Sequence, residues 1–185
     1  MKKILIGTHN KGKFKEIAYL ISKKYKKISP LSLNIKSPKE TGKSFISNSK
    51  LKVNFFSKYV DYPVISDDSG LRIEALNNKP GIYSARLAKK HGSFHKAMKF
   101  ILKKMKQKKN RKATFVCSLS YKNDYGKIIS TEGRLKGNIA NKILGKRGFG
   151  YDAIFIPIKK KITFGQMSQS KKIKMDHRYI AFQKL

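Results

Sequence analysis

The sequence contains no tryptophan and a single cysteine, Cys117, among its 185 residues. One thiol excludes an intrachain disulfide and a thiolate metal cluster. Because Cys117 lies inside the apolar stretch ATFVCSLSY, we expect it to be buried and inert. No apolar run reaches the roughly 20 residues that span a bilayer, and the basic N-terminus lacks the apolar segment of a signal peptide. These absences predict a cytoplasmic protein that does not contact membranes.

Acidic residues are also scarce: 10 Asp and Glu stand against 44 Lys and Arg, which gives a formal net charge of +34. Such an excess suggests a polyanionic partner. However, 38 of the 44 basic residues are lysine and only 6 are arginine, the better residue for bidentate recognition of phosphates and bases. The lysines are spread along the whole chain. We therefore favour solvated lysine-rich faces, with nonspecific affinity for nucleic acid at low salt, over a specific nucleic-acid site.

Apolar periodicity predicts a single α/β domain over residues 1–185, with a mixed central β-sheet flanked by helices. The expected strands are 3–8, 28–35, two short strands within 63–76 that meet at an acidic turn, the two arms of a hairpin at 113–121 and 126–137, and 153–157. The expected helices are 13–25, 44–59, 94–105 and a last helix that starts at Ser168. In the second helix we expect Ile46, Val53, Phe56 and Val60 to be buried.

The segment GTHNKGKF, residues 7–14, follows an apolar run and matches seven of the eight positions of the P-loop pattern. The eighth position is Phe14, where a P-loop supplies the hydroxyl that binds Mg²⁺. This mismatch argues against a P-loop. A turn that enters a helix still presents backbone N–H groups and a helix dipole, and Lys11 and Lys13 add two ammonium groups. The segment is therefore a candidate phosphate-binding loop.

Two of the acidic residues, Asp67 and Asp68, are adjacent in the stretch SDDSG. Adjacent carboxylates repel one another unless geometry separates them or a cation neutralises them. Mg²⁺ commonly binds through one or two carboxylates together with substrate phosphates, but the spacing fits a helix N-cap or an Asx turn equally well. In the stretch GKRGFGYDAIF, glycines around Phe149 and Tyr151 permit the close approach of a planar ligand, and a hairpin turn is again the alternative.

Taken in order, these segments resemble those of the inosine triphosphate pyrophosphatase, or Ham1-like, family of purine NTP pyrophosphatases. ILIGTHNKGKFKEI is similar to the family's opening T-x-N-x-x-K loop and helix, KETGKSFISNSKLKV to its E-T-G segment, and SDDSGLRIEALNNKPGIYSARLA to its D-D-S-G-L signature. TFVCSLS, EGRLKGNIA, GFGYDAIFIP and the terminal DHR follow in the family's order. The resemblance covers nearly the whole chain and implies a mixed sheet in two lobes around a cleft, as in Maf-like proteins.

The resemblance also implies a homodimeric, Mg²⁺-dependent enzyme that hydrolyses ITP, dITP and XTP to the monophosphate and pyrophosphate, and so keeps deaminated purines out of nucleic acid. It implies Glu40 and Asp68 as metal ligands, with Asp68 also accepting a proton. The predicted substrate-binding residues are Thr8, His9, Asn10, Lys11, Gly12, Lys13, Ser69, Phe149, Gly150, Tyr151, Asp152, Lys172, His177 and Arg178. Of these, Lys172, His177 and Arg178 match the residues with which the family reads the base.

Three positions depart from the family pattern, although none removes a catalytic group. His9 stands where many members have glycine, Asp176 replaces the serine before His-Arg, and Ala153 replaces the proline after F-G-Y-D. Two other functions are open at this point. One is a Maf-like pyrophosphatase acting on modified pyrimidine or guanine nucleotides, which would lack the combination of GFGYD and DHR, and the other is a basic nucleic-acid-binding protein.

Overall fold

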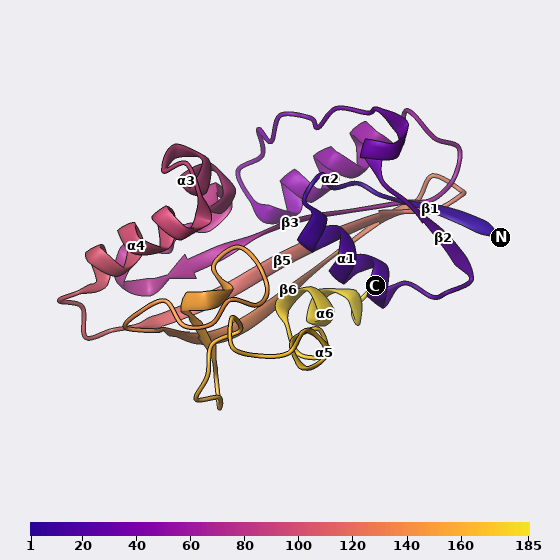
Figure 1. Cartoon of the computed structure of the whole chain (residues 1–185). Coiled ribbons are helices and arrows are strands. Elements are labelled where there is room, and N and C mark those ends of the chain that lie inside the picture. The colour runs from indigo at the N-terminus through magenta and orange to yellow at the C-terminus, as the bar shows by residue number, and fades with distance from the viewer. The chain divides into compact units, whose positions relative to one another are not determined.

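Seven strands form one β-sheet in the computed structural model, which describes residues 1–185 (Figure 1). The strands are β1 (Lys2–Ile6), β2 (Tyr25–Ile28), β3 (Val64–Ile73), β4 (Lys79–Pro80), β5 (Lys112–Lys122), β6 (Ile128–Ile139) and β7 (Phe155–Pro157). Their order is β2–β1–β3–β5–β6–β7, and β4 pairs with β3 outside this path. β1 is parallel to β2 and β3, whereas β4 is antiparallel to β3 and β7 to β6. The sheet is therefore mixed, as predicted.

Helices flank this sheet and confirm the predicted α/β class. The α-helices are α1 (Lys11–Leu20), α2 (Phe45–Phe56), α3 (Ser84–Lys90), α4 (Phe94–Met105), α5 (Gln169–Lys172) and α6 (His177–Phe182), and the 3-10 helices are η1 (Pro30–Leu33), η2 (Glu74–Leu76), η3 (Gly81–Tyr83) and η4 (Asp152–Ile154). Ser44 and Ser47 form a reciprocal capping box that fixes the start of α2. None of the helices has both the length and the apolar character needed to cross a membrane.

The chain divides into two compact units. The first comprises residues 1–68, 117–133 and 178–185, and the second comprises residues 69–116 and 134–177. β3, β5 and β6 each contribute residues to both units, since each strand contains one of the boundaries.

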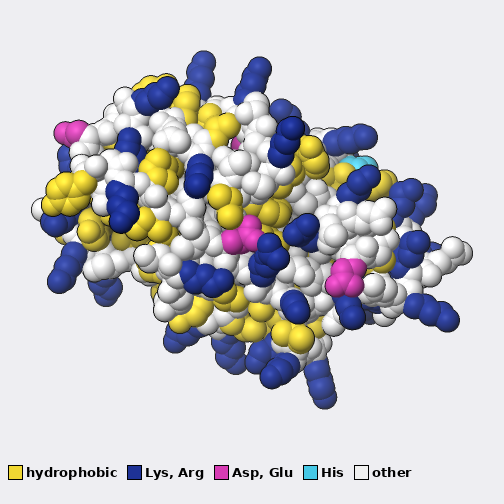
Figure 2. Space-filling model, turned by 180° about the vertical axis from the view of Figure 1, so that it is seen from behind, with side chains coloured by type: hydrophobic (Ala, Val, Ile, Leu, Met, Phe, Trp, Pro, Cys, Tyr) yellow, Lys and Arg dark blue, Asp and Glu magenta, His cyan; other side chains and the backbone are white.

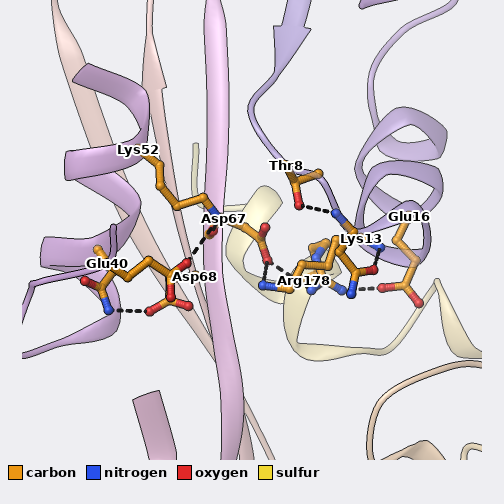
Figure 3. A network of polar contacts seen from close by, with 10 residues as sticks. Thr8, Lys13, Glu16, Glu40, Lys52, Asp67, Asp68 and Arg178 are labelled. Atoms are coloured by element: carbon orange, nitrogen blue, oxygen red, sulfur yellow. Dashed lines mark hydrogen bonds and ion pairs between the residues drawn. The ribbon is translucent and has the colours of Figure 1, made fainter. Parts of the chain in front are cut away.

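In the first unit, side chains of β1 and β3 alternate between two faces. One face packs against α1 and α6 in a buried cluster of Ile4, Ile6, Ile17, Ile21, Ile65, Cys117, Leu119 and Ala181. The other face packs against α2 in a buried cluster of Leu5, Ile35, Val53, Phe56 and Val64. The same alternation continues along β3, so it directs Asp67 toward the α1 and α6 side and Asp68 toward the α2 side (Figure 3).

Aromatic packing forms much of the core of the second unit. The rings of Phe115 and Phe155 lie with centroids 4.4 Å apart, and those of Phe155 and Phe164 lie 5.6 Å apart. The predicted helix over 94–105 is confirmed as α4, which buries Ala97, Met98, Ile101 and Met105. The predicted hairpin is confirmed as β5 and β6, which are joined by a turn that the hydrogen bond from the Asn123 N–H to the Lys127 carbonyl closes.

The prediction of two short strands joined at an acidic turn is wrong. β3 runs without interruption from Val64 to Ile73 through Asp67 and Asp68. Asp residues disfavour strands because their short polar side chains compete for the backbone. Here nearby side chains on both faces of the strand bind the two carboxylates, so that no turn is needed.

Other predicted boundaries also differ from the structure. The predicted strand over 28–35 is wrong: the strand is Tyr25–Ile28, and Pro30, which has no N–H to donate to a ladder, begins η1 instead. α1 correspondingly ends at Leu20 rather than at 25. The predicted last helix is divided into α5 and α6. In α2, Val53 and Phe56 are buried as predicted, but Ile46 is exposed.

Candidate active site

The candidate phosphate loop, residues 7–14, leads from β1 into the first turn of α1 and rests directly against neighbouring elements. A Cβ atom at Gly7 would lie 2.1 Å from Ser66 Oγ and 2.5 Å from the Phe56 ring. Real Cβ atoms do not approach other atoms this closely, so only glycine allows the loop to pass here. The loop is therefore fixed between β3 and α2.

Side chains within the loop fix the start of α1. Asn10 Oδ1 accepts a hydrogen bond from the Lys13 N–H at 2.9 Å, and the buried Thr8 accepts one through Oγ1 from the Asn10 N–H at 3.2 Å. No acidic side chain lies in the first turn of α1, so nothing there offsets the positive end of the helix dipole. Phe14, at the position of the P-loop hydroxyl, packs against the apolar cluster under α1. The loop can thus receive an anion without a P-loop metal ligand.

Asp67 lies among positive charges on the α1 and α6 side of β3 (Figure 3). Its Oδ2 is 3.1 Å from Lys13 Nζ and 3.1 Å from Arg178 Nη2. Arg178 Nη1 also pairs with Glu16 Oε2. The side chains of Asp67, Glu16 and Arg178 are almost wholly buried, whereas that of Lys13 is 16% exposed. Two carboxylates and two cations are thus buried together, and Lys13 is the member of this group that reaches the surface.

The charges around Asp67 determine its protonation. Burial by itself would raise the pKa of Asp67, but the charges of Lys13, Arg178 and Lys52, together with a hydrogen bond from Arg178, hold that pKa well below its usual range. Burial would similarly lower the pKa of Lys13, but the charges of Asp67 and Asp68 more than offset it and raise that pKa. Asp67 is therefore a carboxylate at neutral pH, and Lys13 is an ammonium.

Asp68 lies on the α2 side of β3, where α2 holds it in place (Figure 3). Asn48 Nδ2 donates a hydrogen bond to Asp68 Oδ2 at 2.9 Å. One turn further along α2, Lys52 Nζ donates to the backbone carbonyl of Asp67 at 2.5 Å and lies 3.7 Å from Glu40 Oε1. α2 therefore contacts both predicted metal ligands.

The pKa of Asp68 is shifted in the opposite direction from that of Asp67. Burial raises the pKa of Asp68 to about 6, and the negative charge of Glu40 contributes to the rise. The charges of Lys13 and Lys52 and the hydrogen bond from Asn48 oppose the rise without cancelling it. Asp68 is consequently a carboxylate that is poorly compensated by the protein itself.

The pair of Glu40 and Asp68 fits a divalent cation. The charge of Glu40 disfavours the ionised form of Asp68, and a cation bound by both carboxylates would remove this repulsion. Both donors are hard carboxylate oxygens, which Mg²⁺ prefers. No third His, Cys, Asp or Glu lies close enough to form a three-residue metal site with them. The remaining coordination positions would be filled by water or by the phosphates of a ligand.

The second unit contains its own charged and aromatic cluster around Asp152. Asp152 Oδ2 accepts a hydrogen bond from the Phe149 N–H at 2.8 Å and lies 2.6 Å from Lys172 Nζ. Lys172 Nζ is also 4.7 Å from the centroid of the Phe149 ring. Gly148 and Gly150, at φ of 75° and 65°, form the turn that presents Phe149. A buried ammonium beside an aromatic face can bind a planar ring that carries hydrogen-bond acceptors.

Two further predicted residues of this unit are anchored in its core. The Tyr151 hydroxyl donates a hydrogen bond to the Ser84 carbonyl at 2.8 Å, and burial raises the pKa of Tyr151. His177 stacks on Phe115 with ring centroids 4.7 Å apart and planes within 10°. Tyr151 thus supports the turn that carries Asp152, and the orientation of the His177 ring is fixed by packing.

The structure divides the predicted site residues between the two units. Residues 8–13, Glu40, Asp68 and Arg178 belong to the first unit, where the loop, Glu40 and Asp68 gather around β3. The second unit contains Ser69, Phe149, Gly150, Tyr151, Asp152, Lys172 and His177. Arg178, which was predicted to read the base, is bonded here to Glu16 and Asp67.

Four members of the network in the first unit lie outside the predicted site: Glu16, Asn48, Lys52 and Asp67. A sequence signal existed for two of them, because Asn48 and Lys52 are four residues apart and share one helix face. Strand alternation could have separated the roles of Asp67 and its neighbour, had β3 been predicted as one strand. Burial of Glu16 depends on its pairing with Arg178, 162 residues away, and has no local signal.

The chain matches known proteins over its full length. Residues 4–185 match the model of the Ham1 family. The chain belongs to the Ham1 family. It is 40% identical, over 98% of its length and 91% of the relative's, to a protein of Dictyoglomus thermophilum named dITP/XTP pyrophosphatase. It is 37% identical, over 99% of its length and 95% of the relative's, to a protein of Caulobacter vibrioides with the same name.

Among solved structures, the Ham1 protein of Staphylococcus aureus resembles this chain with a TM-score of 0.87 and 34% identity, covering 99% of this chain and 95% of that one. Membership of the Ham1 family confirms the resemblance inferred from the motifs and decides against a Maf-like protein. It also agrees with Phe14, which packs against the apolar cluster under α1 at the position where a P-loop has a hydroxyl. The Ham1-family fold therefore provides the setting for the two clusters described above.

Proposed function

We propose that this chain hydrolyses ITP, dITP and XTP to the corresponding monophosphate and pyrophosphate, with Mg²⁺ as its cofactor, and so removes deaminated purines from the nucleotide pool. The observation that carries the proposal is that α2 holds both Glu40, through Lys52, and the buried Asp68, through Asn48, in a Ham1-family chain whose phosphate loop lies against the same helix. The names of the relatives support the choice of substrate.

The triphosphate binds at the phosphate loop. Thr8 and Asn10 hold the loop backbone in place through their side chains. The positive end of the α1 dipole attracts phosphate, and Lys11 and Lys13 supply positive charge. Lys13 is partly exposed and keeps its proton because Asp67 lies beside it. It is therefore suited to neutralise the charge of the leaving pyrophosphate.

Glu40 and Asp68 hold the cofactor, and Lys52 and Asn48 orient these two carboxylates from α2. Bound Mg²⁺ supplies Lewis-acid stabilisation of the phosphate charge. The Lys52 ammonium also holds β3 through the Asp67 carbonyl, so the strand and the Glu40 carboxylate share one anchor.

Asp68 accepts a proton from the water that attacks the α-phosphorus. The bond between the α-phosphorus and the oxygen that bridges to the β-phosphorus then breaks, and pyrophosphate leaves. Asp68 is ionised at neutral pH, because its pKa is raised only to about 6 and a bound cation would favour the carboxylate further, so it is in the form that can accept a proton. The hydrogen bond from Asn48 keeps one carboxylate oxygen in place while the proton is transferred.

On the strength of the family resemblance, Lys172 and His177 of the second unit and Arg178 of the first read the base, and Phe149 of the second unit offers a stacking surface. Lys and Arg can only donate hydrogen bonds, and hypoxanthine and xanthine carry a 6-keto acceptor where adenine carries a 6-amino donor. Adenine would leave buried donors unpaired, at a cost of about 1–3 kcal/mol per group. Guanine shares the 6-keto oxygen, so a comparison of ITP with GTP isolates recognition of the 2-amino group.

A homodimer is part of the proposal, on the strength of the family resemblance. The mass in solution, measured by light scattering during size-exclusion chromatography, tests it directly. A monomeric mass at micromolar concentration would overturn the homodimer while leaving the proposed reaction untouched.

The reaction is tested by a phosphate-release screen over ITP, dITP, XTP, GTP, ATP and dUTP, with inorganic pyrophosphatase as the coupling enzyme and with Mg²⁺ or EDTA. We expect Mg²⁺-dependent release from ITP, dITP and XTP that clearly exceeds release from ATP. Preference for dUTP or modified pyrimidine triphosphates would contradict the proposal, and so would release that is unchanged in EDTA.

The large positive charge does not favour a nucleic-acid-binding function. Figure 2 shows the Lys and Arg side chains spread over the displayed face, with neutral and hydrophobic atoms between them, rather than gathered into one patch. Tight nucleic-acid binding at physiological salt, combined with no turnover in the screen, would nevertheless favour that alternative.

A further inference from the structure

The side chain of His9 points away from the rest of the phosphate loop and contacts residues 26 and 28 positions further along the chain. Its Nε2 lies 2.8 Å from the Ile35 carbonyl oxygen, and its Nδ1 lies 2.7 Å from Ser37 Oγ. A carbonyl can only accept, so Nε2 carries the proton, and in the neutral ring Nδ1 accepts from the Ser37 hydroxyl. Both ring nitrogens are therefore bonded to the chain itself rather than directed to a ligand.

The segment that His9 reaches carries Glu40. Residues 34–43, which we call the Glu40 segment, contain no helix or strand. The side chain of Ile35 anchors its first part in the apolar core. Near its far end, the Gly42 N–H donates to Asn48 Oδ1 at 2.8 Å, and Glu40 pairs with Lys52. The contacts of Glu40 and Gly42 thus come from α2, whereas His9 connects the segment to the phosphate loop.

The position of the His9 ring is itself supported. Its centroid lies 6.1 Å from that of the Phe56 ring, with 32° between the planes. Phe56 is fully buried and also faces the Gly7 backbone. Phe56 thus contacts both Gly7, where the phosphate loop begins, and the ring of His9.

We propose that His9 is a positioning residue, which holds the Glu40 segment against the phosphate loop so that the Glu40 carboxylate and the Lys13 ammonium are presented together. This inference rests on the proposed function. His9 contacts neither metal nor phosphate in this role, which differs from the direct substrate contact predicted from the sequence. It acts through the backbone at Ile35 and the hydroxyl of Ser37.

Two variants separate the hydrogen bonds from the packing of the ring. His9→Phe keeps an aromatic ring beside Phe56 and removes both hydrogen bonds, and His9→Gln restores a donor for the Ile35 carbonyl. His91→Phe is the matched control, because His91 also lies against a phenylalanine, Phe100, and belongs to neither cluster.

The first measurement is hydrogen exchange of the ligand-free proteins, which does not depend on catalysis. In His9→Phe we expect exchange of the hydrogen-bonded Ile35 and Gly42 amides at the two ends of the segment to accelerate by about tenfold, with α2 unchanged, because the two hydrogen bonds of His9 are lost. We expect His9→Gln to lie between His9→Phe and the wild type, and His91→Phe to match the wild type. Unchanged exchange in His9→Phe would overturn the inference.

The second measurement is steady-state hydrolysis of ITP at varied Mg²⁺. In His9→Phe we expect KM for ITP and the Mg²⁺ concentration for half-maximal rate each to rise by about five- to tenfold, with kcat within about twofold of the wild type. Unchanged KM and Mg²⁺ dependence would overturn the inference, as would a fall in kcat alone. If the wild type does not hydrolyse ITP, the proposed function fails, and the exchange of the Ile35 and Gly42 amides still decides whether His9 holds the segment.

Discussion

Asp67 and Asp68 are neighbours in the chain, yet the two faces of β3 place them in opposite electrostatic environments. On the α1 and α6 face, Lys13 and Arg178 neutralise Asp67 and keep it ionised. On the α2 face, burial and Glu40 raise the pKa of Asp68 to about 6. Strand alternation thus makes one aspartate a structural anion and leaves the other with the reactivity that a base or a metal ligand needs.

The largest effect that we expect is a loss of kcat when Asp68, on the α2 face, is replaced. Asp68→Asn should lower kcat for ITP on the order of 10³-fold, because proton transfer by a positioned base contributes roughly 10²–10⁴-fold. The variant should fold, as judged by circular dichroism. Asp124→Asn, at an exposed turn, is the control and should keep full activity. Turnover retained in Asp68→Asn would assign the base to another group.

The largest effect on stability should come from the other face. Asp67→Asn removes the partner of two buried cations and should lower the free energy of unfolding by about 3–5 kcal/mol, measured by urea denaturation. A variant as stable as the wild type would show that Lys13 and Arg178 do not depend on Asp67. The contrast between the two faces would then fail.

In the proposed function Lys13 contacts both Asp67 and the triphosphate, so its removal should weaken substrate binding. Lys13→Met should raise KM for ITP by roughly 10- to 100-fold, because a charge-assisted hydrogen bond contributes about 1.5–3 kcal/mol. Lys15→Met is the matched control on the same helix, since Lys15 is exposed. Equal KM values in the two variants would count against the phosphate loop.

Replacing Arg178 tests whether a residue on the α1 and α6 face also contributes to the selectivity for ITP over ATP. Arg178→Lys keeps a positive charge near Glu16 and Asp67 but loses the planar donor group. If Arg178 reads the base, the ratio of kcat/KM for ITP to that for ATP should fall by about tenfold. Equal losses for both substrates would instead make Arg178 a residue that positions Asp67 and Lys13.

The last effect that we expect is a gain in stability in Asp68→Asn that depends on pH. The folded protein retains the proton of Asp68 up to about pH 6, whereas an unfolded aspartate loses it near 3.8, so this group lowers the free energy of unfolding as pH rises between these values. Asp68→Asn should therefore be more stable than the wild type by about 1–3 kcal/mol at pH 7, with no gain at pH 4.

Paired urea denaturation at pH 4 and pH 7 measures this difference. Asp67 should show the opposite trend, because its pKa is lowered on folding: the stabilisation that it contributes is present at pH 7 and is lost as pH falls below the ordinary value of 3.8. A gain for Asp68→Asn that is equal at both pH values would contradict the assignment of environments.

Local signals predicted the elements that depend on local physics. The spacing of Phe94 to Met105 and the two arms around Asn123 correspond to α4 and to the β5–β6 hairpin. β3 could not be predicted as one strand, because Asp, Ser and Gly in succession indicate a turn. The contacts that override this preference come from Lys13, Arg178 and Asn48, far away in sequence.

The site was predictable in part for the same reason. The phosphate loop, Glu40 and Asp68 were proposed because motifs place them, and the structure brings them together around β3, while their roles stay predictions. Glu16 and Lys52 support these residues only through space, and the pairing of Glu16 with Arg178 has no pattern along the chain. Predicting such supporting residues requires the arrangement of the strands and helices first.

The absence of a side chain at Gly7 determines when the phosphate loop becomes ordered. Because the loop backbone lies directly on Ser66 and Phe56, its conformation is set as the first unit folds. The entropy lost in ordering it is therefore part of folding rather than of ligand capture. Under the proposed function, a nucleotide meets a preorganised receptor, and its binding free energy is available for orienting the scissile anhydride instead of arranging the loop.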